Sequence, residues 1–420
     1  MTKYKRITGM RDVLFEEQRY WRFILATIQK TVDLFGYQRL DTPLLEQASL
    51  FIRGVGEGTD IVEKEMYIFE DRDGDLLALR PEFTAGIMRS FVENGLHTLP
   101  TPLKVWTVGP LFRHEKNQKG RYRQHSQFDI EVIGEADPAV DVEVINVAWH
   151  LFTQLGFTGL RLYINSTGCP TCKPIYIQAL VEYFSQFAEQ LPPDDKMRLE
   201  KNPLRILDSK EAVTQPLLEN APHITDYLCE DCAEHFTKLK EYLSAINRPY
   251  EVDYRIVRGL DYYTKTVFEI KAEGLGSQDT ICGGGRYDGL IEELGGRPTP
   301  GIGFGSGIER YVIAMQHLGL ELPAEPFPKV TVSYLGETAK RAGLQLIERL
   351  HNAQIGALFT PGDRSLKAQL KSAHRAEAAF AIILGEDEVK AGQASVRDMS
   401  NSEQIKIELD EVVGWLKERL

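Results

Sequence analysis

The 420-residue sequence contains no apolar run that approaches the ~20 residues needed to cross a bilayer. The basic residues near its start are not followed by an apolar segment, so we expect neither a membrane protein nor a cleaved secretory signal. Disorder-prone and low-complexity composition is also lacking, since 43% of the residues are hydrophobic and 26% are charged. These absences predict a cytoplasmic globular protein, and the length predicts two or three domains.

The sequence also lacks a net positive charge. Its 49 Lys and Arg residues are outnumbered by 61 Asp and Glu residues, which gives a formal net charge of −12. That balance argues against a generic nucleic-acid-coating protein, although a local basic patch can still bind RNA. No Ser-His or Cys-His pair stands out as a covalent nucleophile. The sequence is therefore consistent with a reaction that needs no covalent enzyme intermediate.

Cysteine is scarce, and four of the five cysteines form two C-x-x-C pairs. The pairs are Cys169 with Cys172 and Cys229 with Cys232. In a reducing compartment such pairs are thiols or metal ligands rather than disulfides. Each pair has metal-ligand spacing, but 56 residues lie between them, far more than in an ordinary zinc ribbon. Two interpretations stay open: a structural zinc ion, or four reduced thiols.

Short β-rich runs and helical stretches alternate up to a Pro-rich joint, ELPAEPFP (321–328). Residues 168–248 are helix-rich and contain both cysteine pairs, so we expect an insertion there. Strand signals resume at 254–256. Beyond the joint, strands and helices alternate as in a small α/β domain with a partly parallel sheet. The predicted class is α+β: a mostly antiparallel core (1–325) with a helical insertion, then an α/β domain (326–420).

The segment FRHEKNQKGRYRQHSQFDIEVIG (112–134) predicts a hairpin with a basic loop. Arg113 and Arg123 can approach a polyanion from its two strands, because guanidinium groups match phosphate oxygens. Lys116, Gln118 and Lys119 at the tip remain free for a second partner. The alternative is a solvated basic hairpin with no ligand.

Polar residues alternate along the strand that follows this loop. Gln127, Asp129 and Glu131 share one sheet face, where they can recognise a cationic or amine-bearing ligand. In LRPEFTAG (79–86), Glu82 and Thr84 stand where a strand gives way to a helix. A carboxylate there can accept hydrogen bonds from a ligand ammonium group, or it can merely satisfy the N–H groups of the helix start.

A second polar segment is RGLDYYTKTVFEI (258–270), read as a strand that begins at Arg258. A lone tyrosine in a strand usually packs in the core. Because Tyr262 and Tyr263 stand close to Arg258 and Asp261, we expect this segment to form a pocket wall.

Glycine occupies every second position in GIGFGSGIER (301–310). Alternate glycines strip one strand face of side chains, so that a flat ligand can lie against the backbone. Arg310, just inside the following helix, can close over that ligand. CGGGRYDGL (282–290) shows a weaker version of the pattern. In the C-terminal domain, one predicted helix face is either solvated or faces RNA: it carries Arg364, Lys367, Lys371 and His374.

Six segments of the sequence, taken in their order along the chain, resemble motifs of the histidyl-tRNA synthetase family of class II aminoacyl-tRNA synthetases. FGYQRLDTPLLE (35–46) resembles motif 1, whose Pro43 would lie at a dimer interface. The 112–134 and 301–310 segments resemble motifs 2 and 3. RGLDYYTKTVF and GGGRYDGL resemble the two histidine signatures. GDRSLKAQLKSAHRA (362–376) with FAIILGEDEV (380–389) resembles the anticodon-binding domain.

The resemblance implies a homodimeric histidine–tRNA ligase that converts ATP, L-histidine and tRNA(His) to histidyl-tRNA(His), AMP and diphosphate through histidyl-adenylate. It implies catalytic roles for Arg258 and Arg113, and Mg²⁺ alongside ATP. The implied histidine ligands are Glu82, Phe83, Thr84, Gln127, Glu131, Arg258, Tyr262 and Tyr263. The implied ATP ligands are Arg113, Arg121 and Arg310. Residues near the tRNA acceptor end would be Lys116, Gln118 and Arg123.

The sequence departs from the family pattern at two places. Phe83 stands where the family usually has Gly, and His125–Ser126 replaces the usual Phe-His. The second change lies where a ring would stack on adenine, and an imidazole can also stack there.

Two other functions remain as alternatives. One is an inactive paralogue that serves as a histidine-sensing regulatory subunit, as in ATP phosphoribosyltransferase. Such subunits typically lack the C-terminal domain and have a degraded histidine signature. This sequence has the C-terminal domain and an intact histidine signature. The other is a class II synthetase for threonine, proline or glycine, which offer no imidazole for Glu131 to bind.

Overall fold

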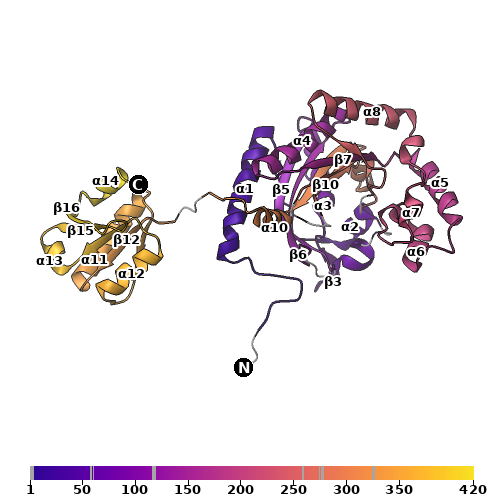
Figure 1. Ribbon diagram of the computed structural model, residues 1–420. Coiled ribbons are helices and arrows are strands. Elements are labelled where there is room, and N and C mark those ends of the chain that lie inside the picture. The colour runs from indigo at the N-terminus through magenta and orange to yellow at the C-terminus, as the bar shows by residue number, and fades with distance from the viewer. Residues whose placement is uncertain are drawn as a thin grey trace. The chain divides into compact units, whose positions relative to one another are not determined.

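The computed structural model describes residues 4–56, 59, 61–115, 120–257, 260–273, 275, 279–323 and 327–420. The chain divides into two compact units, Met1–Leu322 and Pro323–Leu420. The first unit contains an eight-stranded and a three-stranded sheet, and the second contains a five-stranded sheet. Helices cover the sheets of both units (Figure 1). The predicted α+β class is confirmed.

The large sheet has the strand order β1-β5-β6-β11-β10-β9-β7-β8. Its strands are β1 (Gln38–Arg39), β5 (Leu103–Phe112), β6 (Gln124–Ile133), β11 (Gly301–Gly307), β10 (Thr280–Arg286), β9 (Thr264–Lys271), β7 (Arg161–Ser166) and β8 (Glu251–Val252). The strands from β5 to β7 pair antiparallel, and the two edge strands pair parallel with their neighbours. The pairing of β6 with β11 brings together two segments that lie far apart in the sequence.

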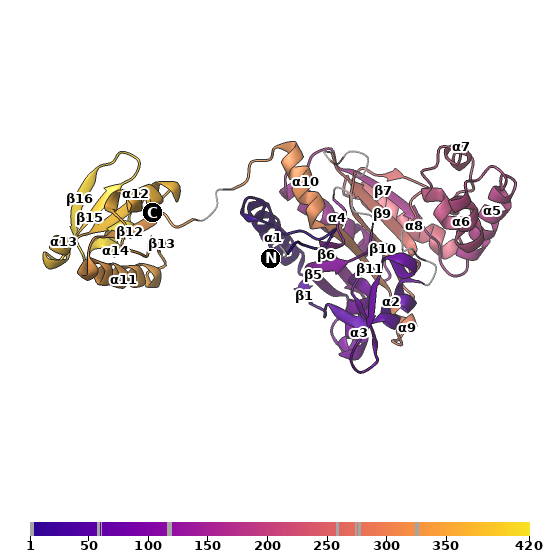
Figure 2. The same ribbon diagram turned by 90° about the horizontal axis from the view of Figure 1, so that it is seen from below.

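One face of this sheet is covered by long helices (Figure 2). They are α1 (Phe15–Phe35), α4 (Pro138–Gln154), α8 (Glu230–Ala245) and α10 (Ile308–Leu318). In α1, buried Ile24, Ile28 and Val32 recur at helical spacing and enter the same core as the sheet residues. Asp137 caps the start of α4, because its side chain accepts a hydrogen bond from the N–H of Ala139 in the first turn.

The other face carries the three-stranded sheet, in the order β2-β4-β3, and three helices. These elements are β2 (Leu45–Gln47), β3 (Tyr67–Glu70), β4 (Leu76–Leu79), α2 (Ala48–Val55), α3 (Thr84–Glu93) and α9 (Leu290–Glu293). The link from β4 to α3 is short, so the residues of this turn are placed over the large sheet.

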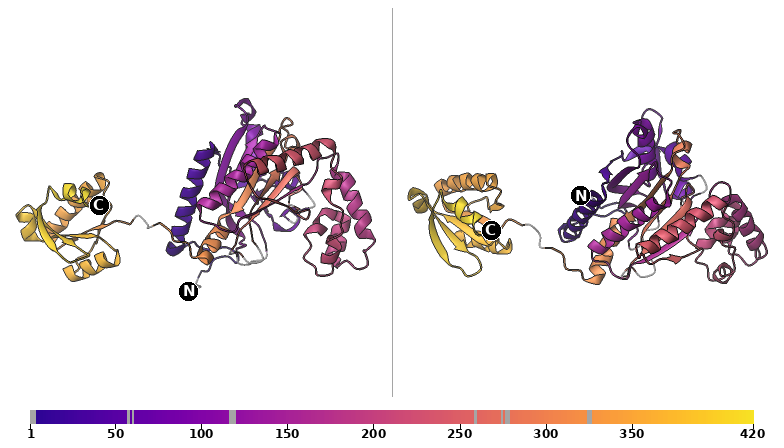
Figure 3. Two further views of the ribbon diagram at one scale, coloured as in Figure 1. Left: turned by 45° about the horizontal axis from the view of Figure 1, so that its top comes forward. Right: turned by 90° about the horizontal axis from the view of Figure 1, so that it is seen from above.

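The helical insertion packs around a core of its own (Figure 3). It comprises α5 (Lys173–Ser185), α6 (Pro193–Lys201), the 3₁₀ segment Pro203–Asp208, α7 (Gln215–Leu218) and a 3₁₀ turn, Ile224–Asp226. α8 then leads back and packs against α4 of the larger unit.

Two strand predictions near the insertion are wrong. The chain turns at Tyr254 and Arg255 instead of extending, because the Asp253 carboxylate accepts the N–H of Arg255 at 3.0 Å. Tyr262 also lies in a turn, and Tyr263 directly precedes β9, which begins only at Thr264. Arg258, where that strand was expected to begin, lies outside the described residues.

The smaller unit has the strand order β13-β12-β14-β15-β16, in which the first three strands are parallel and the last two pair antiparallel. Its elements are β12 (Val330–Tyr334), α11 (Glu337–Asn352), β13 (Ala357–Phe359), α12 (Leu366–Arg375), β14 (Phe380–Leu384), α13 (Glu386–Lys390), β15 (Gln393–Asp398), β16 (Gln404–Glu408) and α14 (Val412–Lys417). The expected partly parallel sheet is therefore present. Across the described parts of both units, no helix is long and apolar enough to cross a membrane.

Candidate active site

A small cavity of about 150 Å³ lies over β6, β11 and β10 of the large sheet. Three carboxylates, those of Glu82, Asp129 and Glu131, line it. Among the described residues of its wall, Arg113 is the only cation. This excess of negative charge suits a small ligand that carries positive charge or several N–H donors.

Glu131 is held by hydroxyl groups from two other elements. The Thr84 hydroxyl donates to Oε1 at 2.7 Å, and the Tyr287 hydroxyl donates to Oε2 at 2.5 Å. Burial raises the pKa of Glu131 well above its ordinary value, and the charges of Asp129 and Glu82 act in the same direction. The sequence did not single out Tyr287, although the GGGRYDGL motif contains it.

Glu82 satisfies N–H groups at a helix start and also lines the small cavity. Its carboxylate accepts the backbone N–H groups of Thr84 at 2.7 Å and of Ala85 at 2.9 Å, at the start of α3. The same side chain lines the cavity. Burial raises its pKa, although these hydrogen bonds and the charge of Arg113 oppose the rise.

Asp129 carries a buried oxygen that is not satisfied within the described structure. Its Oδ2 accepts a hydrogen bond from Gln127 Nε2 at 3.0 Å, whereas its Oδ1 has no hydrogen-bond partner there. Burial raises the pKa of Asp129 well above its ordinary value. Because a buried unpaired oxygen is costly, this atom fits a ligand donor.

The glycines of β11 face the polar residues of β6. Gly303 pairs with Glu131 and Gly305 pairs with Asp129. A Cβ atom on Gly303 would lie 1.8 Å from Glu131 Oε2, and one on Gly305 would lie 2.2 Å from Gln127 Nε2. The alternate glycines therefore make room for the polar side chains of the neighbouring strand, in addition to exposing backbone to the cavity.

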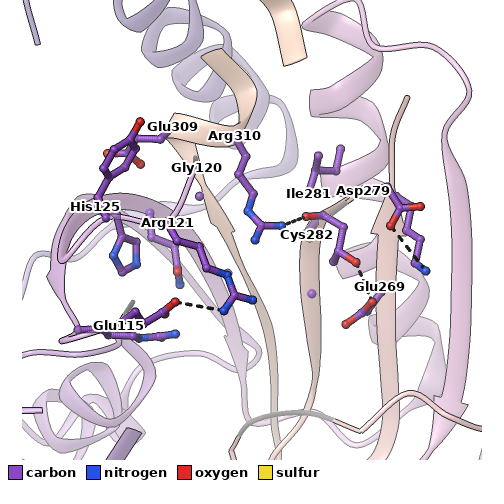
Figure 4. A pocket seen from close by; sticks show the side chains of 18 of the residues that line it. Glu115, Gly120, Arg121, His125, Glu269, Asp279, Ile281, Cys282, Glu309 and Arg310 are labelled. Atoms are coloured by element: carbon purple, nitrogen blue, oxygen red, sulfur yellow. Dashed lines mark hydrogen bonds and ion pairs between the residues drawn. The ribbon is translucent and has the colours of Figure 1, made fainter. Parts of the chain in front are cut away.

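A second, larger cavity of about 520 Å³ adjoins the first. Figure 4 shows the guanidinium groups of Arg121 and Arg310 pointing into it. Arg310 Nη1 donates to the carbonyl oxygen of Thr280 at 2.5 Å, and Arg121 pairs with Glu115 at 3.2 Å. Two or more arginines in one open cavity suit a polyphosphate.

Arg113 lines both cavities, as do Gln127 and two glycines. Its Nε donates to the carbonyl oxygen of Pro81 at 2.8 Å, which fixes the guanidinium group on the β4–α3 turn. A group at this junction can contact a carboxylate in the small cavity and a phosphate in the large one.

Comparison with known proteins finds relatives that match almost the whole chain. A profile described as Histidyl-tRNA synthetase matches residues 9–169 and 184–310, and one described as Anticodon binding domain matches 329–419. The chain is 48% identical over 417 residues to a histidine–tRNA ligase of Dehalococcoides mccartyi, covering 99% of this chain and 100% of that one. It is 45% identical over 415 residues to that of Pelotomaculum thermopropionicum, with 99% and 98% covered.

The crystal structure of the apo S. aureus histidyl-tRNA synthetase matches with a TM-score of 0.83 at 34% identity, covering 99% of this chain and 100% of that one. The chain belongs to the histidyl-tRNA synthetase family. The predicted ligase class is thereby confirmed, and the comparisons do not support the regulatory-subunit alternative.

The unusual His125 of this family member lines the large cavity (Figure 4). Burial lowers its pKa to about 3, and the charges of Arg113 and Arg310 contribute. The ring is therefore uncharged near neutral pH. Next to it, Glu309 accepts the N–H of Ser126 at 2.9 Å, and burial raises the pKa of Glu309 to about 7.

Other residues implied by the family resemblance fall into three groups. Tyr262 and Tyr263 line the small cavity. The Phe83 ring lies in the core with the Arg80 guanidinium 4.4 Å from its centroid, and the Arg123 side chain packs against Gly9. Neither side chain lines either of the two cavities described above. The remaining residues lie outside the described part of the chain: Lys116, Gln118 and Arg258.

The two cysteine pairs meet in space, although 56 residues separate them in the sequence. The four Sγ atoms lie within 4.8 Å of one another. All four residues are free thiols, and both Cys172 and Cys232 are buried. This cluster lies outside both cavities.

Proposed function

We propose that the protein activates L-histidine with ATP and then transfers the histidyl group to tRNA(His). A histidine carboxylate oxygen attacks the α-phosphorus of ATP, diphosphate leaves, and a ribose hydroxyl of the tRNA displaces AMP from the adenylate. The observation that carries this proposal is the junction at Arg113, which lines a carboxylate-rich and an arginine-rich cavity together. Such a reaction needs positioning and charge neutralisation, and no covalent nucleophile.

In the small cavity, Glu82, Thr84 and Gln127 bind the α-ammonium group of histidine, and Asp129 Oδ1 supplies a further acceptor. Glu131 and Tyr263, with Tyr262, bind the imidazole. The hydrogen bond from Tyr287 supports this role of Glu131, because it fixes the carboxylate that recognises an imidazole N–H. The excess of carboxylates favours histidine, which carries N–H groups on both its α-amino group and its imidazole, over threonine, proline or glycine.

In the large cavity, Arg113 binds the α-phosphate, Arg121 and Arg310 bind the remaining phosphates, and His125 stacks on adenine. Arg258 bridges the histidine carboxylate and the α-phosphate. Glu115 and Glu269 of the cavity wall would hold Mg²⁺, which prefers one or two carboxylates beside phosphates. The ion would supply positive charge to neutralise the leaving diphosphate.

The tRNA contacts both units in this proposal. Lys116, Gln118 and Arg123 lie near the acceptor end, and the 326–420 domain binds the anticodon. Lys367, Lys371 and His374 of α12 in the smaller unit supply a basic helix face for this contact, whereas Arg364, expected on the same face, precedes the helix, which is capped by Ser365. A structural Zn²⁺ ion at the four cysteines completes the cofactors, and the protein acts in the cytoplasm.

The proposal includes a homodimer. Five large apolar side chains are exposed in and beside the β2-β4-β3 sheet: Leu44, Leu45, Ile68, Phe69 and Leu76. Pro43 of motif 1 adjoins them in the sequence. A concentration of exposed apolar residues on one small sheet is typical of a protein interface.

ATP–diphosphate exchange with each of the twenty amino acids tests the function, and Arg258→Ala tests the bridging role. We expect exchange with histidine alone, and its collapse in the variant. Exchange with another amino acid would refute the histidine assignment but keep the class II core. Histidine binding without any exchange would instead support a regulatory paralogue.

A further inference from the structure

The four cysteines have the geometry of a tetrahedral metal site. Cys169 Sγ lies 3.7 Å from both Cys229 Sγ and Cys172 Sγ, and Cys172 Sγ lies 3.8 Å from Cys232 Sγ. A zinc ion with four Zn–S bonds of ~2.3 Å requires S···S edges of about 3.8 Å. A disulfide would require about 2.05 Å. These three S···S distances match the edges of a tetrahedral site, all four sulfur atoms lie within 4.8 Å of one another, and none of the three distances is that of a disulfide.

The surroundings of the cluster are those of thiolate ligands. Cys172 Sγ accepts the N–H of Cys169 at 3.1 Å, and Cys169 Sγ accepts the N–H of Thr171 at 3.4 Å. Such N–H···S contacts stabilise sulfur that carries negative charge. A side chain at the preceding Gly168 would place its Cβ atom 2.7 Å from Cys172 Sγ, so the turn admits only glycine there.

The cluster lies where the insertion leaves and rejoins the catalytic unit. Cys169 and Cys172 occupy the turn between β7 and α5, and Cys229 directly precedes α8. A single ion therefore ties the two ends of the 173–228 segment together.

The same cluster is joined to the wall of the small cavity. The N–H of Lys265 donates to the carbonyl oxygen of Gly168 at 2.7 Å, and the N–H of Thr167 donates to that of Lys265 at 2.8 Å. The Thr167 hydroxyl donates to the carbonyl oxygen of Tyr263 at 3.1 Å. Lys265 Nζ also pairs at 2.8 Å with Asp231, which stands between the two cysteines of the second pair.

A further contact comes from Lys173, directly after Cys172, whose Nζ donates to the carbonyl oxygen of Asp261 at 3.2 Å. Lys265 itself has a φ of 49°, a left-handed conformation that a lysine adopts only when its surroundings hold it there. Residues 261–265 are thus held by both cysteine-bearing turns.

We propose that the four cysteines bind one Zn²⁺ ion that positions residues 261–265, and with them Tyr262 and Tyr263, against the small cavity. The ion takes no part in the chemistry. It sets the geometry of the histidine site from outside, so its removal weakens histidine binding and leaves the nucleotide site unchanged. The metal site stands on sulfur geometry alone, whereas its effect on histidine rests on the proposed function.

Metal analysis of the full-length protein, purified under reducing conditions without chelator, tests the site. We expect one zinc per chain, its loss in Cys172→Ser and Cys232→Ser, and its retention in Cys282→Ser, which changes a buried cysteine outside the cluster. Cobalt should replace zinc and produce thiolate-to-cobalt charge-transfer bands. Iron in place of zinc, or neither bound metal nor cobalt uptake, would overturn the proposal.

Exchange kinetics test the positioning role. In the zinc-free protein we expect the KM for histidine to rise about tenfold, which corresponds to a loss of ~1.4 kcal/mol of binding free energy. The KM for ATP should remain unchanged. Lys265→Met should raise the KM for histidine in the same direction while zinc is retained, even if the cysteine variants do not fold. The matched control is Lys238→Met, which removes an exposed ion pair with Glu234 on α8.

Zinc that leaves without any change in the KM for histidine would refute the positioning role. Stoichiometric zinc in a protein without histidine-dependent exchange would refute the proposed function and still support the metal site.

Discussion

Glu131 and Gly303 face each other across the β6–β11 pair, and a Cβ atom on Gly303 would lie 1.8 Å from Glu131 Oε2. The carboxylate thus occupies the volume that any other residue at position 303 would fill. Because the Thr84 and Tyr287 hydroxyls hold both of its oxygens, Glu131 cannot move aside without losing a hydrogen bond. The glycine pattern of motif 3 and the acidic strand of motif 2 therefore depend on each other.

Gly303→Ala should displace Glu131 and raise the KM for histidine by at least about tenfold. Overpacking of this kind costs about 1–3 kcal/mol, so the melting temperature should fall as well. Exchange kinetics and calorimetry measure the two effects. Gly289→Ala serves as the control, because no atom lies within 4 Å of a Cβ added there. An unchanged histidine KM in Gly303→Ala would show that Glu131 does not read the substrate.

Histidine affinity should fall as the pH is lowered through the raised pKa values of Asp129 and Glu131. These carboxyls must be ionised to bind a cation, and burial favours their protonated form. Calorimetric titration in two buffers of different ionisation enthalpy should also detect proton release on binding. Binding that is independent of pH between about 5 and 8 would contradict the assignment.

The stability of the ligand-free protein should change with pH in the opposite direction. The folded pKa of Asp129 is raised, so its contribution to stability is fully present below the unfolded value of about 4 and is lost as the pH rises through the folded value. Asp129→Asn should remove this part of the pH dependence. Thermal unfolding of both proteins across pH 4 to 8 measures the difference, which includes the effect of the Asp129 charge on the pKa of Glu131.

His125→Ala should weaken ATP binding about tenfold, since stacking on a base contributes about 1–3 kcal/mol. His125→Phe should restore the affinity, because the ring stacks without charge in both cases. ATP dissociation constants from calorimetry compare the three proteins. An alanine variant that binds ATP as tightly as the parent would exclude stacking.

Arg113→Ala should lower kcat for exchange by about 10²–10³-fold, as expected for a lost donor to a charged transition state. Arg341→Ala removes an exposed arginine on α11 of the smaller unit and should leave exchange unchanged. A raised KM for ATP with an unchanged kcat would show that Arg113 binds the ground state and the transition state equally.

Phe69→Lys combined with Leu76→Lys should convert a dimer to a monomer, because two charges would be buried in an apolar interface. Sedimentation velocity measures the mass. Leu344→Lys, at an exposed leucine of the smaller unit, is the matched control. A parent protein that is already monomeric would overturn the dimer proposal.

The sequence by itself determined the fold class, because its periodic patterns are local. The strict alternation of Gln127, Asp129 and Glu131 placed them on one face, and the Pro-rich joint marked a change of domain character. Local turn chemistry was harder to predict. The Asp253 side chain accepts the N–H of Arg255 and turns the chain where the sequence predicted a strand (254–256). Tyr262 likewise lies in a turn, although tyrosines favour strands.

Only the tertiary structure decided which distant residues share a site. Tyr287 meets Glu131 because β6, β11 and β10 are neighbours, and no spacing along the chain encodes that order. The structure likewise brought the two cysteine pairs within 4.8 Å across 56 residues, and it placed the Phe83 ring in the core. Sequence patterns fix which face a side chain takes, because strand and helix periods are local, whereas contacts between elements depend on strand order and packing.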